Sequence, residues 1–287
     1  MKWSSSPPVA LALSLCLPSV AFAQTPHSDL TAVEREIVRL VNQERIRRGL
    51  PALAVSDQLS EAARRQAELI AERRQLSHRF PGQPILSERI AATGLHFDSA
   101  GENASETSDT GDVLRDAADA QGTLMLSPPH RENILNPKYN AIGVAAASSG
   151  GHVWLVQDFA RVYPSVAVTD VEARAVQALD RARRRSGAAP LLVVAEDGLR
   201  PFACRENVTP TLLLARFPRA SFALVYTIFN IDDFPADLLH PAGESALHSL
   251  AVAACPEKQK ERHGSYRVVM LLFTERAAAG GATRRQE

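Results

Sequence analysis

The chain has 287 residues, of which 45% are hydrophobic and 22% are charged. This balance excludes a disordered chain and a protein with many membrane spans. Basic residues and acidic residues each number 32, so the net charge is zero, and no overall attraction to nucleic acid is expected. The length fits two domains of modest size or one large one.

The first 23 residues have the features of a secretory signal peptide. Lys2 supplies a positive start, an apolar stretch runs from Pro8 to about Val20, and small residues precede Gln24. The alternative is a helix that stays in the membrane, but the stretch is short for a span of about 20 residues, and Pro18 interrupts it. We expect cleavage before Gln24, a periplasmic or extracellular location, and no integral membrane span.

Two cysteines remain once Cys16 leaves with the signal peptide. Cys204 and Cys255 are candidates for a disulfide in an oxidising compartment, and closing such a loop would stabilise the fold by about 4 kcal/mol. Two unpaired buried thiols are the alternative. Neither cysteine lies in a Cys-x-x-Cys spacing, which excludes a zinc finger.

Helical signals open the mature chain. Thr31 and Glu34 have the spacing of a capping box, and apolar residues then recur at helical spacing until Gly49 and Pro51. A second helix with one apolar face is expected after Ser56.

Two further helices and a hairpin follow. One helix fits residues 84–94, which begin with proline, and a weaker one fits residues 112–126, which contain Gly122. Apolar stretches at 141–147 and 153–160 flank a Ser-Ser-Gly-Gly turn, which is typical of a β-hairpin. Helices followed by an antiparallel sheet predict an α+β fold without parallel βαβ units.

The pattern then starts again in the second half. Thr169 and Glu172 repeat the spacing of the first capping box, and residues 251–254 and 267–273 resemble the first hairpin. Three residues match at one constant spacing: Val176, Arg183 and Arg185 match Val38, Arg45 and Arg47. A diverged, shortened repeat explains this series, and two unrelated amphipathic helices with common caps are the alternative.

These observations predict a signal peptide at 1–23, a first domain at 24–163 and a second at 164–287. The basic cluster near the end of the repeated helix is expected to be solvated. It consists of Arg181, Arg183, Arg184 and Arg185.

Three polar landmarks carry the chemistry of the first half. They are His78 in Leu-Ser-His, Glu102 in Gly-Glu-Asn, and His130 in Pro-Pro-His-Arg-Glu-Asn-Ile-Leu. Two imidazoles and a carboxylate can bind a divalent ion, zinc above all, or act as acid and base around a hydrolytic water. Each histidine can also be structural, because spacing alone does not bring the three together.

The order Leu-Ser-His, Gly-Glu-Asn, His-Arg-x-Asn-Ile-Leu and Val-Gln-Asp-Phe resembles the CAP superfamily of cysteine-rich secretory, antigen 5 and pathogenesis-related 1 proteins, in its bacterial secreted form. The resemblance covers about Leu30 to Ala160. It implies a three-layer α-β-α sandwich with a surface cleft lined by His78, Glu102 and His130. Some relatives bind zinc there, so His78 and His130 would be ligands, and Glu102 a ligand or the group that orients a bound water.

The sequence also departs from the family. Leu124 stands where many members have a tryptophan, and only Asp112, Asp116 and Asp119 offer a second acid on the helix before the His-Arg segment. The second half keeps none of the cleft motifs, and we interpret it as a diverged, shortened CAP-like α+β domain that stabilises the protein or binds a partner. His240 falls near the place of a cleft histidine by coincidence.

Three functions remain. The first is an exported protein whose cleft binds a divalent metal, a small apolar or peptide ligand, or both, without turnover. The second is a metal-assisted hydrolase of peptide or cell-wall substrates, with Glu102 as general base. The third is a structural envelope module. The missing second acid favours binding over catalysis, and the sequence does not indicate an oligomeric state.

Overall fold

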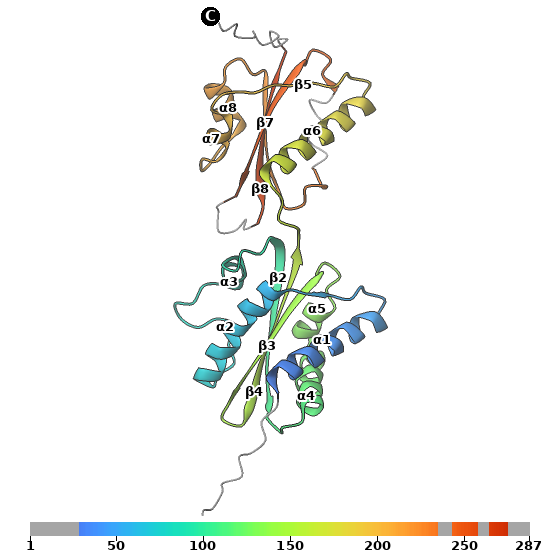
Figure 1. Ribbon diagram of the computed structural model, residues 1–287, viewed down its shortest axis with the longest axis vertical. Helices are drawn as coiled ribbons and strands as arrows, with labels where there is room; N and C mark the ends of the chain where they lie inside the picture. Colours follow the sequence, from blue (N-terminus) through green and yellow to red (C-terminus); the bar gives the residue numbers. More distant parts are fainter. Residues whose placement is uncertain (1–28, 235–242, 258–263, 275–287) are drawn as a thin grey trace, which may run out of the picture.

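A computed structural model describes residues 29–234, 243–257 and 264–274. The predicted signal peptide at 1–23 and His240 lie outside the described residues. Figure 1 shows two lobes, one after the other along the chain, each built on a sheet of its own. None of the helices within the described ranges is long and apolar enough to cross a membrane.

The first sheet has the strand order β1-β3-β4-β2. Its strands are β1 (Ala54–Val55), β2 (Phe97–Ser108), β3 (Ala141–Ser149) and β4 (His152–Val162). The β3–β4 hairpin and the β2–β4 pair are antiparallel, and the hairpin confirms the sequence prediction. The short β1 pairs with β3 in parallel, a contact that the sequence did not predict.

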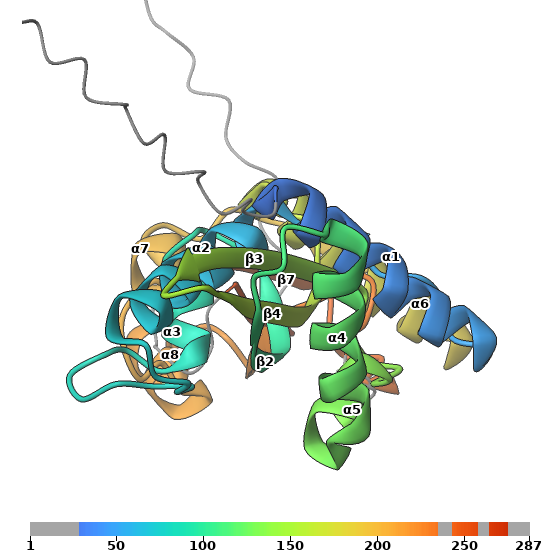
Figure 2. The ribbon, with the colours of Figure 1, turned by 90° about the horizontal axis from the view of Figure 1, so that it is seen from below.

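Helices cover both faces of this sheet. They are α1 (Leu30–Arg47), α2 (Asp57–Arg73), α3 (Leu86–Ala91), α4 (Val113–Leu126) and α5 (Pro128–Ile134). Side chains of α1 and α4 pack with Leu155 and Phe159 of β4, whereas α2 packs with Val156 and Ala160 on the opposite face. Alternate side chains of β4 thus point to opposite faces of the sheet and contribute to a hydrophobic core on each face. The three layers seen in Figure 2 are the α-β-α sandwich predicted above.

The predicted capping box is wrong. Asp29 caps α1 by accepting from the amide of Ala32. Glu34 turns away from the helix start, and its Oε1 accepts from the backbone N–H of Ala146 in β3 at 3.0 Å. Glu34, the acid of the predicted capping box, therefore accepts a hydrogen bond from a backbone amide at the open edge of the sheet. The helix predicted at 84–94 is also shorter, because α3 starts only after Ile85.

The second lobe repeats this topology. Its sheet has the order β5-β7-β8-β6, and it again combines one short parallel pair with two antiparallel pairs. The strands are β5 (Leu192–Val193), β6 (Phe222–Ile228), β7 (Ser249–Pro256) and β8 (Tyr266–Phe273). Strands β7 and β8 confirm the second predicted hairpin.

Two side-chain contacts recur at matching places in both lobes. In α6 (Val168–Arg185), Glu172 Oε1 accepts from the amide of Ala254 in β7, as Glu34 does from Ala146. Arg45 and Arg183 are both buried and donate to backbone carbonyls of the loops that follow. These shared contacts show that the sequence matches between the two halves of the chain belong to a structural repeat. They also correct one expectation, because Arg183 of the basic cluster is not solvated.

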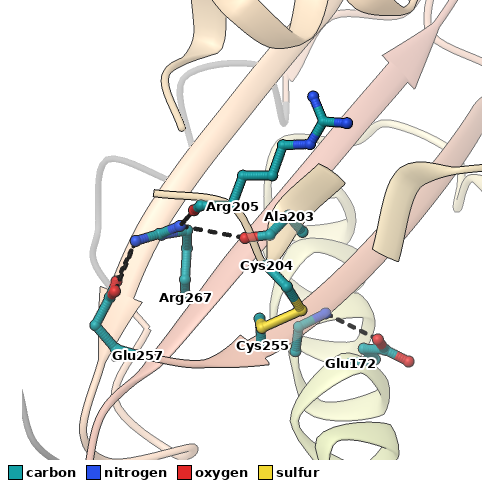
Figure 3. Close-up of a disulfide and its surroundings, with 8 residues drawn as sticks. Glu172, Ala203, Cys204, Arg205, Cys255, Glu257 and Arg267 are labelled. Carbon is teal, nitrogen blue, oxygen red and sulfur yellow. Dashed lines mark hydrogen bonds and ion pairs between the residues drawn. A yellow bond between two sulfur atoms is a disulfide. The ribbon is translucent and has the colours of Figure 1, made fainter. Parts of the chain in front are cut away.

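The second lobe is shorter on one face. Where α2 covers the first sheet, the described part of the second lobe has two short helices, α7 (Leu199–Ala203) and α8 (Pro210–Arg216). Figure 3 shows that the disulfide between Cys204 and Cys255 ties the end of α7 to β7, with Cα atoms 5.4 Å apart. The buried Arg267 donates to the carbonyls of Ala203 and Arg205 on either side of Cys204. The predicted disulfide thus holds the shortened helical layer.

The two lobes touch at the start of β2. His96 Nδ1 lies 3.0 Å from the carbonyl oxygen of Gly264, and the His96 ring lies 5.7 Å from that of Tyr266 between centroids. The backbones come so close that a Cβ on Gly264 would lie 2.6 Å from His96 Cα. The chain crosses between the lobes at residues 163–167.

Candidate functional site

His78, Glu102 and His130 come together at the β2 edge of the first sheet. Nδ1 of His78 lies 2.9 Å from Oε1 of Glu102, and the two imidazole centroids are 6.2 Å apart. The side chain of His78 is 60% exposed, whereas that of Glu102 is only 3% exposed. The imidazole of His78 therefore faces solvent and the carboxylate lies behind it. These three residues form what we call the cleft.

An amide network explains why α5 wraps around the edge of β2. Asn103 Nδ2 donates to the carbonyl oxygen of His130 and to Oε1 of Gln157, and Asn133 Nδ2 donates to Oδ1 of Asn103. Gly101 is required because a Cβ there would lie 2.6 Å from Oδ1 of Asn133. The Gly-Glu-Asn and His-Arg-x-Asn motifs are thus two halves of one contact that places His130 opposite His78.

Arg89 is a residue of this site that the sequence analysis missed. It projects from α3, and its NH2 group donates to Oε2 of Glu102, while NH1 donates to Oε1 of Gln66. Gln66 in turn donates through Nε2 to the carbonyl oxygen of Ser77, next to His78. Both oxygens of Glu102 therefore have described donors, one from each side.

Asp158 is a second acid beside Glu102, and it lies on β4 (His152–Val162) rather than on the helix where the sequence analysis looked for one. It lies directly opposite Glu102 in the β2–β4 register and is almost fully buried. Burial raises the pKa of Asp158 well above its usual range, and the neighbouring charge of Glu102 raises it further. Asp158 stands in Val-Gln-Asp-Phe. Its position next to Glu102 could not be predicted, because the sequence does not give the register in which β2 and β4 pair.

The three aspartates of α4 do not reach the cleft. Asp112 caps the helix, Asp116 is buried against Thr110, and Asp119 pairs with Arg115. Each therefore stabilises the start or the surface of the helix. None of these three aspartates therefore supplies a second acid to the cleft.

The two histidines have opposite electrostatic environments. The hydrogen bond to Glu102 raises the pKa of His78, against an opposing effect of burial. Burial lowers the pKa of His130, and the charge of His78 lowers it further. His130 is therefore neutral at pH 7 and able to offer a ring nitrogen to a ligand.

The side chains fit a cation only through their imidazoles. Within the described ranges, no group of three or more His, Cys, Asp or Glu side chains is arranged to hold a metal ion. Both Glu102 oxygens accept from Arg89 and His78, and its side chain is only 3% exposed, so the ring nitrogens are the accessible candidate ligands. The two imidazole centroids lie 6.2 Å apart, so an ion bound by both rings would lie between them.

A shallow groove lies at the opposite edge of the first sheet. It encloses about 200 Å³ and is lined by Val38, Val55 and Val144 together with polar side chains of α1 and α2. Glu34 and Arg35 are among these polar side chains. The groove is therefore mixed in character and separate from the cleft.

The second lobe has apolar residues where the cleft acids lie in the first. In the repeated registers, Ala223 opposite Leu271 corresponds to Glu102 opposite Asp158. An acid pair has thus been replaced by core side chains, which agrees with the absence of cleft motifs in this half.

Comparisons with known proteins single out the first lobe. Residues 38–159 match the model of the CAP family, the cysteine-rich secretory protein family. The uncharacterised protein YkwD of Bacillus subtilis (strain 168) is 31% identical over 130 residues, which cover 45% of this chain and 48% of that protein. The chain thus spans about half the length of this relative.

Two solved structures cover the same share of the chain. An extracellular protein containing an SCP domain from Bacillus anthracis is 28% identical with a TM-score of 0.40, covering 46% of this chain and 41% of that one. An outer surface protein of Borrelia burgdorferi is 20% identical with a TM-score of 0.40, covering 46% of this chain and 93% of that one.

Proposed function

Because residues 38–159 belong to the CAP superfamily, we propose that this chain is an exported binding protein whose cleft holds a divalent metal ion, without turnover. The observation that carries the proposal is the apposition of the two imidazoles over a buried carboxylate. His78 and His130 would hold the ion, and zinc is the best match because both donors are nitrogen atoms.

Glu102 has a supporting role in this proposal. By accepting from Nδ1 of His78, it fixes the ring orientation and leaves Nε2 to face the ion. A carboxylate behind a metal-bound imidazole also makes the ring a stronger donor. The bound ion would supply Lewis acidity or a docking point for a ligand.

The arrangement favours binding over hydrolysis. A general base must reach a water molecule at the reacting centre, but the Glu102 side chain is only 3% exposed and both of its oxygens accept from described side chains. Asp158 lies next to Glu102 but is almost fully buried. Hydrolysis remains the alternative that a Glu102→Gln variant tests, because a hydrolase would lose its turnover while keeping its metal.

Export is part of the same proposal. Disulfides persist in oxidising compartments, and the bond between Cys204 and Cys255 fits a periplasmic or extracellular protein. The family name and the signal-like residues 1–23 point the same way.

A small apolar or peptide ligand would fit the groove beside Val38, and a purely structural envelope role would need neither the groove nor the cleft.

Zinc titration by calorimetry tests the metal proposal on residues 24–287. We expect one zinc ion per chain, and loss of binding in the double variant His78→Ala/His130→Ala. His152→Ala is the matched control, because His152 makes the same 2.9 Å contact with a glutamate, Glu106, outside the cleft. Equal zinc binding by the double variant, or none by the unaltered protein, would refute the metal site.

A further inference from the structure

The groove at the β1 edge of the first sheet combines an apolar lining with an available cation. Val38, Val55 and Val144 supply the apolar lining, and Val55 is 59% exposed. Arg35 lines the same groove from α1, is exposed, and has no ion pair or side-chain hydrogen bond within the described ranges. Its guanidinium is therefore available to an anion that enters the groove.

The carboxylate that lines the groove is already paired. Glu34 Oε1 accepts from the amide of Ala146, and Arg64 of α2 donates to the same oxygen at 3.4 Å. The side chain of Glu34 is 14% exposed, whereas that of Arg64 is 45% exposed. An anion in the groove therefore meets a net positive charge from the surrounding side chains.

The groove also reaches the edge of strand β3, where β1 pairs with β3 only as far as Ile142. The carbonyl of Ile142 points to this edge, because it accepts from the amide of Ser56. The amide of Ala146 points the same way, because it donates to Glu34. Backbone groups alternate in direction along an antiparallel strand, so the N–H and C=O of Val144, between these two residues, also point towards the groove.

The second lobe differs at two of the positions that line this groove. Ala173 stands at the place of Arg35, and Arg200 stands at the place of Ser60, directly after a matching Asp-x-Leu. Arg200 donates to Glu172 at 2.8 Å, so its long side chain joins the two elements between which the groove of the first lobe lies open. The other lining residues are the same in both lobes: Thr31, Glu34, Val38, Val55 and Val144 correspond to Thr169, Glu172, Val176, Val193 and Val252.

We propose that this groove binds the carboxyl-terminal residue of a peptide, with an aliphatic side chain against the valines and the terminal carboxylate on Arg35. Its volume of about 200 Å³ suits a single residue, since sites for drug-sized ligands enclose about 300–1,000 Å³. The peptide backbone can bond to Val144 at the strand edge, a contact that a free aliphatic acid lacks. This inference rests on the ligand-binding part of the proposed function and does not involve the metal.

Fluorescence polarisation tests this site on residues 24–287. The probe is an amino-terminally labelled Gly-Ser-Gly-Ser-Val peptide with a free carboxyl terminus, and the same peptide with a carboxyl-terminal amide is its paired probe. We expect the amide, and separately the Arg35→Ala variant, to lower the affinity at least about tenfold, because a hydrogen bond between charged groups is lost. Arg39→Ala is the matched control, because Arg39 is exposed on the same helix and pairs with Glu36 outside the groove.

Ser60→Arg is a second variant, which places the residue of the second lobe in the first. It should close the groove and abolish binding of the probe. Equal affinity for the acid and the amide, or for the parent and Arg35→Ala, would overturn the proposal.

Two further outcomes would also overturn it. Displacement of the probe by isovaleric acid as effectively as by the unlabelled peptide would mean that a free acid, not a peptide, is the occupant. Absence of probe binding by an unaltered protein that binds zinc would overturn this inference alone and leave the metal site standing.

Discussion

At the scale of single residues, the cleft holds one carboxylate between two basic side chains, with a second, buried acid next to it. Glu102 is held between His78 and Arg89, and Asp158 faces it from the neighbouring strand. Two ionised carboxylates this close in a buried place would repel each other strongly. The pKa of Asp158 in the folded protein is therefore raised well above its usual range.

This raised pKa predicts a pH-dependent effect of Asp158→Asn. Because the pKa of Asp158 is higher in the fold than in the unfolded chain, this group costs stability at pH 7. That cost shrinks as the pH falls through the folded pKa towards the unfolded value. Asparagine has no such cost, so the variant should be more stable than the parent at pH 7, by a margin that shrinks towards pH 4.

Urea unfolding at several pH values measures this margin. Asp116→Asn is a suitable control, because Asp116 is also buried but accepts from the amide and hydroxyl of Thr110. It should lose stability at pH 7. An Asp158→Asn variant that is less stable than the parent at pH 7 would mean that Asp158 is ionised in the fold.

Only part of the site could be predicted from its residues. The motifs identified His78, Glu102 and His130 because each stands in a distinctive local pattern. Arg89 carries no such pattern, and Asp158 stands in Val-Gln-Asp-Phe, which does not mark it as a site residue. Their places depend on how α3 packs against β2 and on the register of β4. Contacts set by packing between distant elements cannot be read from local spacing.

At the scale of elements, the first lobe depends on a very close contact between α2 and β3. A Cβ on Gly143 would lie 2.1 Å from backbone atoms of Leu59 and Ser60. Glycine is therefore the side chain that lets the helix lie directly on the strand. Gly122 in α4 has no atom within 4 Å of such a Cβ.

The two glycines predict opposite effects of one substitution. Gly143→Ala should destabilise the first lobe by several kcal/mol, since backbone atoms must shift, and overpacking alone costs about 1–3 kcal/mol. Gly122→Ala should stabilise α4 by about 0.5–1 kcal/mol, because alanine is the better helix former. Chemical denaturation gives both values, and equal effects at the two sites would contradict the described packing.

Local patterns predicted the presence of elements better than their contacts. Helices α1, α2 and α4 and both hairpins lie where apolar periodicity places them. The capping boxes at Thr31 and Thr169 did not form, because Glu34 and Glu172 instead bind strand amides distant in sequence. The same four-residue spacing fits either role, and only the tertiary fold selects between them.

At the scale of the whole molecule, the protein is two copies of one topology, of which only the first keeps the cleft. The second copy has exchanged the acid pair for Ala223 and Leu271 and lost most of one helical layer. The disulfide between Cys204 and Cys255 compensates for that loss. Its effect should therefore be confined to the second lobe.

The double variant Cys204→Ser/Cys255→Ser tests this confinement. We expect the second lobe to lose about 4 kcal/mol, the typical value for closing a loop of this size, while the first lobe unfolds as before. Hydrogen exchange read by mass spectrometry reports the two lobes separately. Equal loss of protection in β3 and β7 would show that the lobes unfold as one unit.

The central claim is that His78 and His130 together hold a metal ion while Glu102 stays outside its ligand set. X-ray absorption at the zinc edge of zinc-loaded residues 24–287 tests it most directly. The account predicts two imidazole nitrogens at about 2.0–2.1 Å, with water completing the shell. A spectrum with a single imidazole, or with none, would contradict it.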